Sequence, residues 1–171
     1  MSYINQSFFH RSSQTSPAKQ TISTAYTEIT GTKCEVYLRR PSSIVYYTAS
    51  FYFATIYDWA SGGSGDYDKP FLHLKLQKSN DNFSSNIVDI SGTEHNVSGD
   101  TIENRDYYYR ACSPMFLVSG FHGSSHIRLV ARAYSTSNEV DLHRTGQFDG
   151  NNSNEIYFNT SLLVAEIEAN S

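Results

Sequence analysis

The chain of 171 residues is long enough for one domain with its own hydrophobic core and a short extension. Aromatic residues make up 14% of the sequence, mostly Tyr and Phe, and such a composition favours strands over helices. The formal net charge is −4, and no basic run exceeds Arg39-Arg40, which argues against a nucleic-acid-binding protein. The N-terminus lacks a secretory signal and no apolar run approaches bilayer length, so we expect synthesis in the cytoplasm and no membrane contact.

The first 26 residues are predicted to form an N-terminal arm. Residues 1–20 are polar and rich in turn-forming residues, but four apolar side chains interrupt them, namely Tyr3, Ile4, Phe8 and Phe9. A disordered tail normally lacks such aromatic residues. We therefore expect the arm to bind a neighbouring subunit or another protein through these side chains. The alternative is that Phe8 and Phe9 cap the core of their own domain.

Two strands are predicted between residues 34 and 57. The first places Cys34, Val36 and Leu38 on one face, and a proline-containing turn follows it. The second strand, residues 44–57, is apolar on both faces, which predicts that its outer side meets another sheet or another subunit. Its inner face is predicted to carry Val45, Tyr47, Ala49, Phe51 and Phe53, and its outer face Ile44, Tyr46, Tyr52 and Ile56.

A long loop is predicted at residues 58–70, where glycines cluster beside the single tryptophan. An aromatic side chain on a long loop favours a role in recognition. We weigh this above calcium binding, because the Asp residues do not follow the spacing of an EF-hand. A phosphate-binding loop is disfavoured because no lysine follows the glycines. The candidate recognition residues are Asp58, Trp59, Asp66, Tyr67 and Asp68.

The middle of the chain is predicted to contain further strands and turns. Residues 71–78 alternate cleanly, with Leu72, Leu74 and Leu76 inward and polar residues outward. The next segments are predicted to be a polar turn, a short apolar segment, a surface loop and two strands, at residues 79–86, 87–90, 91–106, 107–112 and 114–118. Pro114 interrupts the last two strands, which indicates a bulge or an edge position.

Three strands are predicted to end the chain. The first, residues 126–134, has an inner face formed by Ile127, Leu129, Ala131 and Ala133. Because a short polar turn separates it from residues 139–144, the two segments are predicted to form a hairpin. The last strand is predicted at residues 161–168, with Leu163, Ala165 and Ile167 on its inner face.

These segments predict an all-β protein of eight to ten strands. The predicted architecture is an antiparallel two-sheet jelly-roll sandwich at residues 27–171, preceded by the extended arm at residues 1–26. The two cysteines, Cys34 and Cys112, fall in predicted strands, and we favour burial in the core over a disulfide because thiols stay reduced in the cytoplasm.

The sequence contains no constellation that predicts catalysis, a metal site or a cofactor. Its six histidines are dispersed and form neither a metal-binding motif nor a partner for a nucleophile. Two acidic pairs, Asp66 with Asp68 and Glu166 with Glu168, have the residue types of a glycosidase, but solvent-facing acids give the same pattern. We therefore predict a protein that is not an enzyme.

Several segments resemble jelly-roll virion proteins of tailed phages, particularly those of marine cyanophages. The first half of the domain carries TEITGTKCEVYLRRPSSIVYYTASFYFATIYD and FLHLKLQKS, and the C-terminal part carries LVARAYSTSNEVDLHRTG and SLLVAEIEA. The resemblance covers residues 27–169 and consists of strand and turn patterns. Wider relatives of that family are trimeric jelly rolls of the tumour-necrosis-factor type, so the resemblance implies a homotrimer.

The resemblance implies a structural protein of a phage virion, made in the host cytoplasm. It would be a capsid decoration protein or a tail-associated protein, attached by its arm to the major capsid protein or to tail components. The alternative is a receptor-binding fibre tip or an adhesion module that binds host-surface glycans. In that case Trp59, Tyr67 and the tyrosines at residues 107–109 would stack against sugar rings. The other interpretation of these tyrosines is that they stabilise cross-strand pairs.

Overall fold

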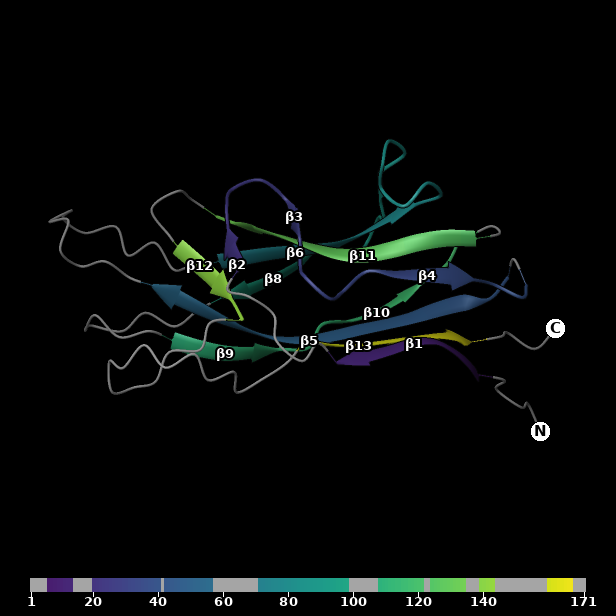
Figure 1. Ribbon diagram of the computed structural model, residues 1–171, viewed down its shortest axis with the longest axis horizontal. Coiled ribbons are helices and arrows are strands. Elements are labelled where there is room, and N and C mark those ends of the chain that lie inside the picture. The colour runs from purple at the N-terminus through teal and green to yellow at the C-terminus, as the bar shows by residue number, and fades with distance from the viewer. Residues whose placement is uncertain are drawn as a thin grey trace, which may run out of the picture.

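The computed structural model describes residues 6–13, 20–40, 42–56, 71–98, 108–121, 124–134, 139–143 and 160–167. Within these ranges the chain forms strands β1–β13 and no helix. The strands lie in two antiparallel sheets that pack face to face (Figure 1). The predicted all-β sandwich is thereby confirmed. Within the same ranges no helix is long and apolar enough to cross a membrane.

The first sheet, sheet I, is organised around the long strand β5 (Ile44–Ile56). One side of β5 pairs with β10 (Met115–Val118) and then with β9 (Tyr108–Cys112). The other side pairs with β13 (Ser161–Ile167) and then with β12 (Glu139–Leu142). Beyond these, β1 (Gln6–Ser13) pairs with β13, and β2 (Gln20–Ile22) pairs with β12.

The second sheet, sheet II, is organised around β11 (Ser124–Ala133) and β6 (Phe71–Ser79), which pair along most of their lengths. The other side of β11, away from β6, pairs with β4 (Cys34–Tyr37) and β3 (Thr27–Glu28). The other side of β6, away from β11, pairs with β7 (Val88–Asp89) and β8 (His95–Ser98).

The order of the strands is that of a jelly roll. Several neighbouring strands continue one another along a single row, namely β1 with β2, β3 with β4, β7 with β8, β9 with β10, and β12 with β13. The chain thus forms eight rows, which we number in chain order. Side by side, sheet I contains the first, eighth, third and sixth rows, and sheet II contains the second, seventh, fourth and fifth. Successive rows thus wind between two sheets as two Greek keys require.

The core lies between the sheets and follows the predicted alternation. On β5 the five predicted inner residues, from Val45 to Phe53, are at most 2% exposed. Leu72, Leu74 and Leu76 of β6 face them from sheet II and are equally buried. Cys34 and Cys112 are also buried, as free thiols. Burial raises the pKa of each thiol to about 12, which keeps both sulfurs protonated and unreactive.

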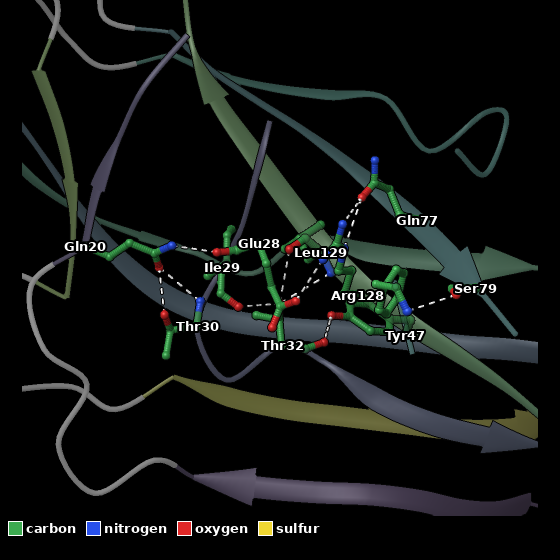
Figure 2. Close-up of polar contacts among 11 residues, drawn as sticks. Gln20, Glu28, Ile29, Thr30, Thr32, Tyr47, Gln77, Ser79, Arg128 and Leu129 are labelled. Carbon is green, nitrogen blue, oxygen red and sulfur yellow. Dashed lines mark hydrogen bonds and ion pairs between the residues drawn. The ribbon is translucent and has the colours of Figure 1, made fainter. Parts of the chain in front are cut away.

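One hydrogen-bonded network ties sheet I to the edge of sheet II through the core (Figure 2). The Tyr47 hydroxyl on β5 donates to the backbone oxygen of Thr32 at 2.5 Å. Thr32 is buried, and its hydroxyl donates to the backbone oxygens of Ile29 at 2.6 Å and Leu129 at 3.2 Å. The turn before Thr32 contains Gly31 with a φ of 85°, a conformation that favours glycine. The network therefore fixes this turn against both β5 and β11.

The predicted hairpin between residues 126–134 and 139–144 is wrong. Both edges of β11 are occupied, one by β6 and the other by β3 and β4. No edge is left for β12, which instead pairs with β5 and β2 in sheet I. A short polar segment between two strands matches a hairpin turn, but it serves equally well for a crossing between sheets.

The predicted inner face of the last strand is also wrong, by one residue. Leu162, Val164 and Glu166 are at most 1% exposed and face the core, whereas Leu163, Ala165 and Ile167 lie on the outer side. Both faces of this strand carry apolar residues, and a glutamate normally stays exposed. Here the backbone N–H of Arg39 donates to Oε1 of Glu166 at 3.0 Å, which offsets part of the cost of burying the carboxylate.

Two smaller differences concern edge strands. Residues 95–98, predicted as part of a surface loop, form β8 at the edge of sheet II, where polar residues are tolerated and Val97 packs against the core. For Pro114, the predicted edge position is confirmed, and the alternative of a bulge is wrong. Cys112 pairs with Phe51 and Met115 with Thr48, so the register is the same on both sides of the proline.

Candidate assembly interface

The outer face of sheet I is apolar where β10, β5 and β13 lie side by side (Figure 1). The pairing register aligns its side chains in rows across the three strands. Leu117 lies opposite Tyr46, which lies opposite Ala165, and the next row contains Met115, Thr48 and Leu163. We call this surface the outer apolar face and define it by Ile44, Tyr46, Thr48, Met115, Leu117, Leu163, Ala165 and Ile167.

Exposure is greatest along β10. Met115 is 66% exposed and Leu117 is 64% exposed, while Ile44, Tyr46, Leu163 and Ile167 are each partly buried. Fully burying a Met or Leu side chain stabilises by about 1.5–3 kcal/mol, so covering the exposed parts of these two would contribute about 2–4 kcal/mol per subunit. Covering the outer apolar face would therefore lower the free energy of the protein.

Serine residues border this face near the middle of β5. Ser50 lies opposite Ser161 in the register, and the hydroxyl of Ser113 donates to the hydroxyl of Ser50 at 2.8 Å. Ser113 precedes Pro114, at the point where β9 gives way to β10. The break in the edge row thus lies beside these serines, and the outer apolar face as defined here lies in the half of sheet I that contains β10 and β13.

The outer face of sheet II has the opposite character. Arg128 on β11 forms an ion pair with Glu28 on β3 at 3.1 Å, and its guanidinium also donates to Oε1 of Gln77 on β6 (Figure 2). Lys75 pairs with Asp89, which also accepts a hydrogen bond from Gln77. These charges are neutralised within the chain, so this surface gains less from an apolar partner.

A buried polar cluster occupies the other half of sheet I, around His143 at the end of β12. The ring Nδ1 of His143 lies 3.1 Å from the hydroxyl of Thr160, and its backbone N–H donates to the oxygen of Tyr52 at 3.1 Å. Burial lowers the pKa of His143 to about 4. A histidine beside a hydroxyl resembles a base with its nucleophile, but both side chains are at most 3% exposed. We assign this pair a structural role.

The acidic pairs that the sequence left open are described only in part. Glu166 is buried inside the sandwich, with its Oε2 lacking a hydrogen-bond partner, while Glu168, Asp66 and Asp68 lie outside the described residues. Within the described ranges no three His, Cys, Asp or Glu side chains are grouped so that they could hold a metal ion.

The predicted arm residues are described only in part. Phe8 lies opposite Ala165 in the register of β1 with β13, and Phe9 is the extra residue at a bulge between Phe8 and His10. The backbone of β1 therefore belongs to the chain's own sheet, whereas the side chains of Phe8 and Phe9 lie outside the description. Tyr3 and Ile4 fall outside it entirely. Binding by the arm stays a prediction.

The predicted recognition loop also lies outside the described residues, with Asp58, Trp59, Asp66, Tyr67 and Asp68. Its role in recognition stays a prediction. Of the tyrosines at residues 107–109, the last two belong to β9, but their side chains are not described.

Sequence reasoning identified the outer side of β5 but missed Met115 and Leu117. The signal was present, because residues 115–118 read Met-Phe-Leu-Val and are apolar on both faces, like β5. Comparison with protein-family models and with curated proteins finds no match. The geometry of the outer apolar face therefore carries the functional assignment.

Proposed function

We propose that this protein is a non-enzymatic structural component of a tailed-phage virion that assembles with copies of itself through the outer apolar face. The observation that carries the proposal is the exposure of Met115 and Leu117 beside the apolar residues of β5 and β13. Contiguous apolar surface of this kind is typical of protein–protein contacts. The resemblance to jelly-roll virion proteins supports a homotrimer and a place on the virion.

The chemistry of the face favours a second copy as the occupant. None of the side chains that define the outer apolar face is charged. Permanent homo-oligomer interfaces are the most apolar class of interface and need no complementary charge pattern. Every copy of the chain offers the same apolar strip, and three copies around a threefold axis would bring their strips together.

Attachment to the particle is assigned to the arm, residues 1–26. Its β1 backbone forms the edge row beside β13, next to the outer apolar face. A bulge such as the one at Phe9 bends an edge strand and changes the direction of the residues around it. We propose that Phe8 and Phe9 contact the major capsid protein or a tail component, or a neighbouring subunit.

The oligomeric state of the full chain tests self-assembly. By light scattering coupled to size exclusion, we expect a trimer for the unmodified protein. Replacing both Met115 and Leu117 with Glu should give monomers, because two carboxylates would be buried without partners in the interface. Both residues are exposed in the single chain, so the variant should keep its fold by circular dichroism.

Tyr37→Glu provides a matched control for this experiment. Tyr37 is also 66% exposed, but it lies on β4 in sheet II, away from the outer apolar face. We expect this variant to remain trimeric. A monomeric unmodified protein at high concentration, or equal dissociation of both variants, would contradict assembly through the outer apolar face.

Immunogold labelling of intact virions tests the place of the protein. An antibody against residues 30–171 should label the particle, over the head for a decoration protein or on the tail for a tail component. Particles that carry no label, although the antibody recognises the purified protein, would rule out the virion assignment.

Glycan binding through the loop at residues 58–70 remains the alternative. A glycan array would support it if binding disappeared in Trp59→Ala.

A further inference from the structure

A second surface feature lies on the outer face of sheet II, at the end where β11, β6 and β8 run side by side (Figure 1). Arg132 lies opposite His73 in the register, and His73 lies opposite Asn96. Nδ1 of His73 and Oδ1 of Asn96 are 2.5 Å apart, which fixes the imidazole and the amide relative to each other. Three different polar side chains thus form one row across three strands.

Arg132 differs from Arg128 and Lys75, the other two cations that face outward from β11 and β6. Arg128 is paired with Glu28, and Lys75 is paired with Asp89. No carboxylate of the described chain pairs with Arg132, whose guanidinium carbon lies 5.4 Å from the centre of the Tyr26 ring. Arg132 is partly exposed. A guanidinium that is held by an aromatic ring and has no acidic partner among the described residues is ready to accept a carboxylate.

Two tyrosine rings border the row. Tyr134 is 55% exposed, and its ring centre lies 6.0 Å from that of His73. Tyr26 is 36% exposed, with the ammonium of Lys75 3.9 Å from its ring centre. Exposed tyrosine faces that are held by neighbouring groups offer apolar contact surface at a low entropic cost.

We propose that this cluster binds a carboxylated saccharide. The guanidinium of Arg132 would take the carboxylate with two parallel hydrogen bonds, an arrangement that matches its planar fork. Tyr134 would pack against the apolar face of the sugar ring, and the Asn96 amide would hydrogen-bond sugar hydroxyls. An acidic peptide would satisfy Arg132 alone, so the tyrosines favour a saccharide. The site lies on the sheet opposite the outer apolar face and does not depend on self-assembly.

Binding of defined polymers to the full chain tests this inference. The probes are polygalacturonate, which carries a carboxylate on each sugar, neutral dextran and polyglutamate, measured by isothermal titration calorimetry. We expect binding to polygalacturonate, none to dextran and much weaker binding to polyglutamate. Arg132→Gln should weaken polygalacturonate binding by about tenfold or more, the effect of losing a charge-assisted hydrogen bond. Arg132→Lys should recover only part of it, because an ammonium cannot make the paired contact.

Two further variants separate the site from general effects. Tyr134→Ala should weaken polygalacturonate binding several-fold, and Lys33→Gln, which removes an exposed positive charge beside β4, should leave it unchanged. Absence of polygalacturonate binding, equal binding to polyglutamate, or equal losses in Arg132→Gln and Lys33→Gln would overturn the proposal. All of these variants should keep the oligomeric state of the unmodified protein, so failure here is distinguishable from failure of the assembly proposal.

Discussion

The outer faces of the two sheets differ in polarity. On sheet I, Met115 and Leu117 expose 66% and 64% of their surfaces beside the apolar residues of β5 and β13. On sheet II, Arg128 is neutralised by Glu28 (Figure 2), and Lys75 is neutralised by Asp89. The outer apolar face gains stability when another molecule covers it, whereas the charges of Arg128 and Lys75 are already paired in water.

The difference arises from one structural rule applied to two sequences. Side chains alternate between the faces of a strand, so each strand contributes equally to the core and to the outside. β10 and β5 place apolar residues at both sets of positions, while β6 places leucines inside and polar residues outside. An apolar outer face lowers the solubility of a single chain. This disadvantage disappears where a partner covers the face.

The largest expected effect on stability concerns His143, which lies beyond the apolar half of sheet I. The pKa of His143 is about 4 in the folded protein, below the ordinary value of 6.5. The unfolded chain therefore takes up a proton at a higher pH than the folded chain does. Stability from this residue is complete above pH 6.5 and falls as the pH is lowered to about 4, by about 3 kcal/mol in total.

Urea unfolding at a series of pH values measures this effect. His143→Asn should reduce the loss of stability between pH 6.5 and 4, because Asn does not titrate. Asn also tolerates the left-handed backbone at this position, where φ is 59°. His95→Asn, which removes an exposed histidine on β8, is the control and should keep the pH dependence of the unmodified protein. An unchanged slope in His143→Asn would refute the assignment.

How far the sequence predicts this architecture depends on whether a strand has one apolar face or two. β6 has one, and the inner positions of Leu72, Leu74 and Leu76 were predicted correctly. β13 has two, and its predicted orientation was wrong: Leu162 and Val164 face the core together with Glu166, whose carboxylate accepts a hydrogen bond from the backbone of Arg39, which is remote in sequence. The alternation of apolar residues does not predict a hydrogen bond between residues that only folding brings together.

The candidate interface was also predictable only in part. The second apolar face of residues 44–57 indicated an outer contact, and the structure places Ile44 and Tyr46 on that side. The neighbours of β5 were not predictable, because pairing of β10 and β13 with β5 depends on the order of rows in the jelly roll. The wrongly predicted hairpin has the same origin, since a short turn does not reveal which sheet receives the next strand.

A smaller effect is expected for the link that fixes one sheet to the other. Tyr47→Phe removes the hydroxyl that donates to the backbone oxygen of Thr32, and this oxygen would be left buried with one partner fewer. We expect a loss of about 1–3 kcal/mol in the free energy of unfolding. Phe116→Leu, at a position that packs against Tyr47 without a hydrogen bond, compares the loss of packing alone. A Tyr47→Phe variant as stable as the unmodified protein would show that the hydroxyl contributes nothing to holding the sheets together.

The smallest effect is expected on the outer face of sheet II, and it tests whether that face is adapted to water. In a double-mutant cycle, Glu28→Gln and Arg128→Met should show a coupling of about 0.5–1 kcal/mol, as expected for an ion pair at a partly exposed site. The coupling should shrink in 1 M NaCl because salt screens exposed charges. Arg128→Met alone should cost more than the coupling, since this side chain also donates to Gln77 and packs 4.1 Å from the centre of the Phe83 ring. A coupling of several kcal/mol that salt leaves unchanged would mean that the pair is shielded from water, and sheet II would then have a covered face as well.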